Sequence, residues 1–240
     1  MGFLLALLTL AWLSGRLSLQ IQTIFVLLTR NIDLTIVLLF LLLLPGIVVH
    51  EAAHWFAARL LGLKTGKFRV WPKKQGKYIG LGSVSVQRGN LWQETIVGMA
   101  PLLVGTILLA LIGQHIFHLF RFSIALTGQQ WQGSWQAFQQ ALQAPDGILW
   151  AYLLFAIANA MMPSASDREP VKPLLVYSAG ALILYLILGL PLTPFAKILV
   201  WVAPILQTVS SALLFTIVLD GLILVGLFLI VQLITPRGQR

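Results

Sequence analysis

The chain consists of long blocks of apolar residues separated by short polar segments. Apolar runs of about 18 residues are long enough to cross roughly 30 Å of hydrocarbon as a helix. The blocks cover residues 34–61, 96–112, 148–163, 174–191 and 212–234, and a shorter apolar segment interrupted by proline covers 195–208. This pattern predicts an all-α polytopic membrane protein, built as a bundle of about five to six transmembrane helices.

The first 30 residues allow two interpretations. Residues 3–13 are apolar but too short to span a bilayer alone. Residues 17–22, LSLQIQ, alternate apolar and polar side chains with the period of two that is typical of a strand. The segment is therefore either one bent span or a short helix followed by a strand.

Two segments between the apolar blocks differ from the rest. Residues 64–88 are basic, rich in glycine and β-branched residues, and contain short alternating runs, which predicts a small membrane-associated β-hairpin. Residues 113–146 are mixed in character, and the string QQWQGSWQAFQQAL predicts an amphipathic helix at the membrane interface. We treat residues 1–240 as a single transmembrane domain with these two insertions.

Composition and charge agree with a membrane protein. Hydrophobic residues make up 58% of the chain and charged residues only 10%, which excludes ordinary soluble classes. The net charge of +9 comes from basic residues that lie mostly between apolar blocks, where they set topology and contact lipid headgroups. We therefore expect the lipid bilayer as a partner and no nucleic acid. The chain has no cysteine, so thiolate ligands and a cysteine nucleophile are excluded.

The distribution of basic residues predicts the orientation. Lysine and arginine concentrate in the 64–88 loop, in the turn at 164–173 and at the C-terminus, whereas the 113–146 segment contains only Arg121. The positive-inside rule then places the 64–88 loop and the C-terminus on the cytoplasmic side. We expect a multi-pass protein of a prokaryotic cytoplasmic membrane or of an organelle membrane.

Three ionisable residues interrupt the most apolar block, in the string LLLLPGIVVHEAAHWFAARLLG. Each residue of an α-helix advances about 100°, so His50 and His54 stand one turn apart on one face and can hold the same ion. Glu51 lies beside them, within reach of a water in the open position of that ion. An acidic residue at this depth costs roughly 2.5 kcal/mol or more on insertion scales. The pattern predicts a zinc site with His50 and His54 as ligands and Glu51 as general base.

A zinc site with two histidines needs a third protein ligand. Asp167 lies on the side toward which the His50 helix descends, and Asp220 is buried in the last apolar block, in the string IVLDGLILVG. The residues alone leave both candidates open. His115 and His118 fall in the segment assigned to the opposite side, so we expect them to be interfacial residues without a catalytic role.

The string HEAAH, the basic hairpin segment, GMAPLLVG at the start of the next block and NAMMPSASD together resemble the site-two protease family of intramembrane zinc metalloproteases. In that family a later helix carries an asparagine, a nearby proline and an aspartate eight residues after the asparagine, and this aspartate is the third zinc ligand. Asn159 and Asp167 have that spacing. The resemblance therefore implies Zn²⁺ held by His50, His54 and Asp167, with Asn159 near the substrate backbone.

The resemblance covers about residues 34–175, the expected catalytic core, and is incomplete. Ser166 and Arg168 flank Asp167 where the family commonly has leucine and glycine. A Leu-Asp-Gly string occurs instead around Asp220, without the upstream asparagine and proline. No stretch is long and polar enough for a PDZ domain, so the chain resembles a compact member of the family.

The function implied by the resemblance is that of a zinc metalloendopeptidase which hydrolyses peptide bonds in or near transmembrane segments of single-span or multi-span membrane proteins. The hairpin is expected either to pair with an extended substrate or to be a surface loop that only sets topology. Asn159 is expected to donate a hydrogen bond to the substrate backbone or to the oxyanion. Two alternatives stay open: a catalytically silent scaffold or chaperone of the same fold, and a membrane metallohydrolase that acts on a non-protein substrate. A transporter is disfavoured because no internal repeat is present.

Overall fold

The computed structural model describes residues 2–75, 78–80, 82–119, 128 and 130–234. Five apolar helical segments are long enough to cross a membrane, and the bent pair α5 and α6 provides a sixth if it is counted as one broken span. The five are α1 (Gly2–Thr29), α2 (Ile32–Leu60), α3 (Leu91–His115), α7 with α8 (Ala165–Arg168 and Val171–Ile187) and α9 (Thr193–Ile234). The bent pair is α5 (Trp131–Leu142) and α6 (Gly147–Ala160). The predicted helical bundle of five to six spans is thus confirmed.

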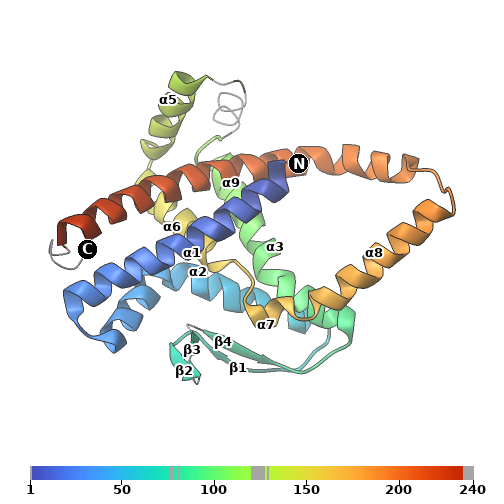
Figure 1. Ribbon diagram of the computed structural model, residues 1–240, viewed down its shortest axis with the longest axis horizontal. Coiled ribbons are helices and arrows are strands. Elements are labelled where there is room, and N and C mark those ends of the chain that lie inside the picture. Colours follow the sequence, from blue (N-terminus) through green and yellow to red (C-terminus); the bar gives the residue numbers. More distant parts are fainter. Residues whose placement is uncertain (1, 76–77, 81, 120–127, 129, 235–240) are drawn as a thin grey trace.

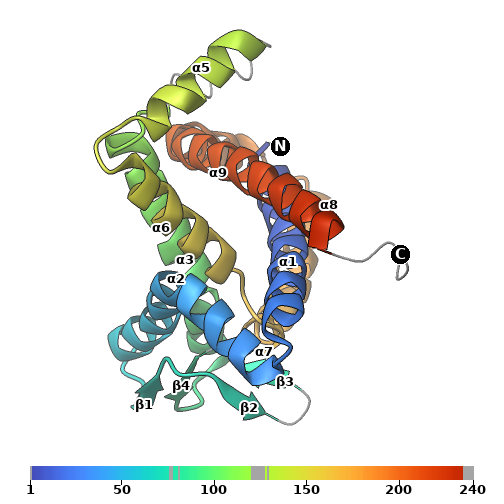
Figure 2. The same ribbon diagram turned by 90° about the vertical axis from the view of Figure 1, so that its left-hand side faces the viewer.

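Helix α1 is one uninterrupted helix, so the interpretation of residues 17–22 as a strand is wrong. Its buried residues recur every three or four positions along the chain, at Ala6, Leu10, Leu13, Leu17, Ile21 and Ile24. This is the spacing of one helical face, and the alternation at 17–22 is a local part of it. The helix packs along α9 (Figures 1 and 2).

Helix α9 joins two segments that the sequence pattern separates. It continues through Pro204 for 42 residues and is therefore about 63 Å long, twice the thickness of a hydrocarbon core. Its buried residues begin only at Val209, and α8 buries none. Figure 1 accordingly shows α8 and the first part of α9 as an arm that extends away from the other helices.

The core lies where α1, α3, α6 and α9 meet. Phe215, Leu154 and Leu109 are fully buried at its centre. A second cluster, around Leu17 and Phe40, joins α1 to α2. These two clusters hold α2 and α6 in a fixed relation, and the histidines lie at the edge of that contact.

The segment after α2 forms the predicted hairpin. Strand β1 (Thr65–Arg69) pairs antiparallel with β4 (Ser83–Val86), and β2 (Lys73–Gln75) pairs antiparallel with β3 (Tyr78–Gly80). The two ladders follow one another along a single interrupted hairpin, which lies beside α2 and α7 in Figure 1. Helix α5 buries Ser134, Phe138 and Ala141 along one face, and its location at a membrane interface stays a prediction.

Candidate metal centre

The histidines are placed by close packing of α2 against α6 and of α3 against α7. A Cβ atom on Gly46 would lie 2.0 Å from the carbonyl oxygen of Ala156, so only glycine lets α6 approach α2 this closely. A Cβ atom on Gly98 of α3 would lie 2.3 Å from the carbonyl oxygen of Asp167. Two glycines therefore bring the end of α6 and the whole of α7 onto the histidine face.

Each histidine is oriented by a backbone carbonyl. His50 Nδ1 lies 2.7 Å from the carbonyl oxygen of Ala160, and His54 Nδ1 lies 2.8 Å from that of Val97. A carbonyl oxygen only accepts hydrogen bonds, so Nδ1 carries the proton in both rings. In the neutral rings both Nε2 atoms then present lone pairs, and these two atoms are only 3.1 Å apart. Two facing lone pairs repel each other unless a cation lies between them.

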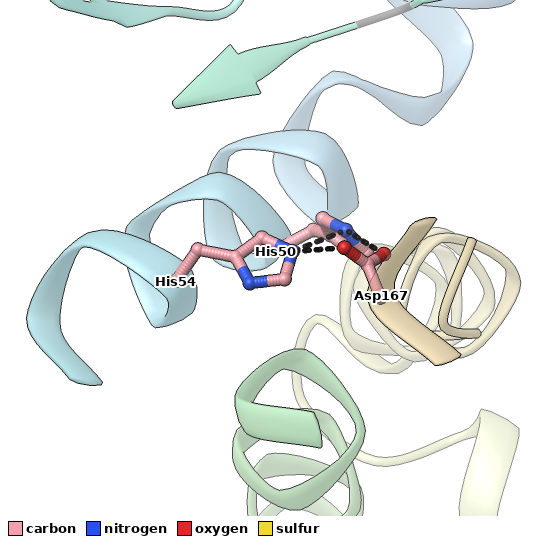
Figure 3. A group of neighbouring side chains, drawn as sticks. All are labelled: His50, His54 and Asp167. Carbon is pink, nitrogen blue, oxygen red and sulfur yellow. Dashed lines mark hydrogen bonds and ion pairs between the residues drawn. The ribbon is translucent and has the colours of Figure 1, made fainter. Parts of the chain in front are cut away.

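Asp167 completes the group. Helix α7 is a single turn whose capping box joins Ser164 and Asp167, and this turn directs the carboxylate at the histidines. One oxygen, Oδ2, accepts hydrogen bonds from the Ser164 backbone N–H at 2.8 Å and from its hydroxyl at 2.5 Å. The other oxygen, Oδ1, lies 3.4 Å from His54 Nε2 (Figure 3). The carboxylate is thus fixed by one oxygen and free to ligate with the other.

These three side chains fit the requirements of a zinc ion. Their ligand atoms all lie within 4.8 Å of one another. Two nitrogens bound to one tetrahedral zinc at about 2.05 Å are about 3.3 Å apart, close to the separation of the two Nε2 atoms. The carbonyls behind the Nδ1 atoms and the serine behind Asp167 supply the outer hydrogen bonds that hold such ligands in place.

Glu51 lies at the wall of a cavity next to this group. The cavity has a volume of about 1140 Å³, and its lining includes His50, Glu51, His54 and Asp167. The Glu51 side chain is only 8% exposed. Gly82, just before β4, covers it so closely that a Cβ atom there would lie 2.7 Å from Oε1. The hairpin therefore lies directly over the carboxylate.

Asp220 does not join the group of ligands. It is completely buried in α9, and its Oδ2 accepts a hydrogen bond of 3.1 Å from Nδ2 of Asn159. The second hydrogen of Nδ2 is engaged by the carbonyl oxygen of Phe155 at 2.9 Å. The expected role of Asn159 as a donor to substrate is therefore not open to this amide, because both of its N–H groups already have acceptors. Asn159 does line the cavity.

The sequence interpretation identified the side chains of the group but missed the atoms that orient them. The carbonyl groups of Val97 and Ala160 have no signature, since every residue has one. Ser164 did have a signal, because Ser-x-x-Asp is a capping-box string. His115 ends α3 about 27 Å along the helix from Val97 and lies outside the group, and its expected interfacial position stays a prediction.

Comparison with known proteins adds no relative. No family model matches the chain, and neither a curated protein nor a solved structure matches it.

Proposed function

We propose that the protein is an intramembrane zinc metalloprotease of the site-two protease type, which hydrolyses peptide bonds in or near transmembrane segments of other membrane proteins. One observation carries the proposal: two histidine Nε2 atoms with carbonyl-fixed tautomers converge with the Asp167 carboxylate, beside Glu51 and on a cavity. The motif resemblance described above supports the same conclusion. A polar cluster that only joined two helices through hydrogen bonds would not require two histidine rings fixed with their Nε2 lone pairs facing each other.

In the proposed reaction His50, His54 and Asp167 hold Zn²⁺, and Glu51 is the general base. A zinc ion held there would supply Lewis acidity, which lowers the pKa of a water and polarises a carbonyl. Glu51 accepts a proton from the attacking water as the new C–O bond forms. It then transfers this proton to the leaving amide nitrogen as the C–N bond breaks. The low exposure of Glu51 limits competing access of bulk water to this carboxylate.

Strand β4 provides a surface for an extended substrate. In the part of the chain that the structure describes, β4 pairs with β1 alone, and Ser83, Val84 and Val86 line the cavity. A peptide bond inside a helix has its carbonyl hydrogen-bonded, so a substrate helix has to unwind before hydrolysis. The open edge of β4 supplies backbone partners for the unwound segment, as in other cases of strand addition.

The several long apolar helices identify an integral multi-pass membrane protein. Within that frame we place the hairpin at 64–88 and the C-terminus on the cytoplasmic side, from the distribution of lysine and arginine. The hairpin follows directly after the C-terminal end of α2, the helix that carries the two histidines. Substrate cleavage is therefore expected nearer to the cytoplasmic face.

The test is cleavage of single-span membrane protein substrates by the purified protein in detergent with zinc present. Glu51→Gln should retain zinc and lose cleavage, while His54→Ala should lose both. Glu94→Gln is the matched control, because Glu94 lines the same cavity and its Oε1 accepts from the Gly89 N–H, which a glutamine oxygen also does. Equal cleavage by the wild type and Glu51→Gln would contradict the mechanism. Zinc binding without any cleavage would favour the silent scaffold instead.

A further inference from the structure

We propose that Asp220 is a positioning residue: it fixes the side-chain amide of Asn159 so that the amide oxygen, and neither N–H group, is presented to the substrate backbone. This inference rests on the proposed function, and it gives Asp220, which the sequence offered only as an alternative zinc ligand, a different role in the site. The expected ligand of Asn159 is a peptide N–H of an extended substrate segment.

The orientation of the Asn159 amide follows from its neighbours. Nδ2 lies within hydrogen-bond distance of the Phe155 carbonyl oxygen and of Asp220 Oδ2, at 2.9 Å and 3.1 Å. A carbonyl accepts only, and so does an ionised carboxylate. Reversing the amide would bring its one oxygen against both the Phe155 carbonyl oxygen and Asp220 Oδ2. The nitrogen therefore faces α9 and the preceding turn of α6.

The amide oxygen is left for another partner. It accepts no hydrogen bond from any residue that the structure describes, and it is not among the described side-chain atoms that are buried without a partner. Asn159 lines the cavity that also contains Glu51 and the metal ligands. An acceptor at this place is complementary to a backbone N–H, whereas an oxyanion would require a donor.

The burial of Asp220 supports a function for its hydrogen bond with Asn159. The side chain is 0% exposed in a membrane-spanning helix, and its second oxygen, Oδ1, has no hydrogen-bond partner in the described chain. Such a group is expensive in a membrane interior. Asn159 donates the one side-chain hydrogen bond that Asp220 accepts from the described residues.

The C-terminal end of α6, which carries Asn159, also orients the proposed metal ligand His50. The position of the Asn159 amide is therefore fixed relative to that ligand. The Asn159 carbonyl oxygen accepts a hydrogen bond of 3.3 Å from the Ser14 hydroxyl of α1, and the next carbonyl, that of Ala160, accepts from His50 Nδ1. Helices α1, α2 and α9 therefore all hold this end of α6. The Asn159 amide is fixed relative to the metal group by backbone, not by a mobile loop.

A spectroscopic test is independent of any substrate. The chain contains three asparagines, Asn31, Asn90 and Asn159, so selective ¹⁵N-asparagine labelling of the zinc-loaded protein in detergent gives three side-chain amide signals, and Asn159→Ala assigns the relevant one. Asp220→Leu should shift that signal and speed the hydrogen exchange of its N–H groups about tenfold or more. Thr216→Val is the matched control, because among the described residues this buried hydroxyl donates only within α9, to the Ala212 carbonyl oxygen. An unchanged Asn159 signal in Asp220→Leu would overturn the proposal.

A kinetic test separates positioning from folding. Loss of one neutral hydrogen bond corresponds to roughly a three- to tenfold change. Asp220→Leu should raise KM by about this factor, with kcat and zinc content near wild type, because a contact made equally in ground and transition states is weakened. Asp220→Asn retains an acceptor for Nδ2 and should restore KM to within about twofold. A KM for Asp220→Leu equal to that of the wild type overturns the role.

Ester substitution in the substrate tests the chemical class of the ligand without touching Asp220. Peptide N–H groups around the cleaved bond are replaced one at a time by ester oxygen. One position should raise KM for the wild type by about three- to tenfold and have no such effect in Asn159→Ala. If every position behaves alike in the two proteins, Asn159 does not accept from the substrate backbone. Absence of all cleavage would instead count against the proposed function, and the amide signals would still test Asp220.

Discussion

Asp167 and Asp220 are two acidic side chains in apolar surroundings, and the fold uses them in opposite ways. Asp167 lies in a one-turn helix, its side chain is 16% exposed, and it directs an oxygen at two histidines. Asp220 lies in the middle of a long helix, is completely buried, and contacts the amide of Asn159. We propose that the first binds an ion from the cavity and that the second orients Asn159 behind the cavity wall.

The difference lies in the backbone that carries each carboxylate. A short capped turn approaches the histidine face end-on, and Gly98 removes the side chain that would hold it away. A residue in the middle of α9 is held at the distance of packed helices, and Asn159 of α6 lies between it and the cavity. Both positions carry the same side chain, so the difference between them comes from the helix that carries each one.

The largest expected effect separates the two aspartates directly. Asp167→Ala should lose zinc and reduce cleavage by a factor of about 10³ or more, because general-base catalysis and Lewis acidity both need the metal in place. Asp220→Ala should retain one zinc per chain and most of kcat. Metal analysis together with cleavage rates checks both variants. Zinc retained in Asp167→Ala and lost in Asp220→Ala would reverse the assignment of the third ligand.

A smaller effect is expected behind Asp167. Ser164→Ala removes the hydroxyl that bonds to Oδ2 of Asp167, and loss of such an outer contact weakens metal affinity about 10- to 100-fold. Competition with a chelator of known affinity measures the change. Ser166→Ala is the matched control, because Ser166 also lines the cavity but its hydroxyl contacts only Ser164. Equal zinc affinity in both variants would show that the capping box is not part of the metal site.

The two candidate histidine ligands follow from local sequence, whereas the third candidate does not. The pair His50 and His54 needs only the helical period, and the apolar context of the motif identifies it as costly. The choice between Asp167 and Asp220 depended on the resemblance, since nothing local distinguishes them. What places Asp167 is the Gly98 contact between α3 and α7, and such contacts depend on the whole fold.

The dependence of such contacts on the whole fold also explains the predictions that were wrong. Residues 17–22 alternate over a segment too short to distinguish a strand from one face of a helix. The helix is favoured because Leu10, Leu13 and Leu17 lie on one helical face and pack against residues of α9. The sequence pattern separated the proline-interrupted segment 195–208 from the block 212–234, but α9 continues through both, because a proline ring in a long apolar helix is tolerated. The donor role of Asn159 failed because its acceptors are a carbonyl one turn before it and a residue 61 positions away.

Metal removal should affect stability through Asp167 and not through Asp220. A metal present at about 100 times its Kd stabilises the folded state by about 2.7 kcal/mol, which corresponds to a thermal midpoint higher by roughly 5 to 10 °C. A chelator should lower the midpoint of the wild type and of Asp220→Asn by this amount, and leave Asp167→Ala unchanged. Thermal unfolding in detergent, with and without chelator, measures it. A chelator effect that persists in Asp167→Ala would place the metal elsewhere.

The smallest effect is expected on the stability of the metal-free protein. Asp220→Leu removes a buried carboxylate with an unpartnered oxygen, which favours the folded state, and leaves one N–H of Asn159 without an acceptor, which opposes it. The two contributions are each about 1 to 3 kcal/mol and nearly cancel, so the thermal midpoint should move by less than about 3 °C, as for Thr216→Val. A fall of 10 °C or more would mean that Asp220 is retained for folding. A midpoint near that of the wild type, combined with a changed KM, means that this carboxylate is retained for its effect on Asn159.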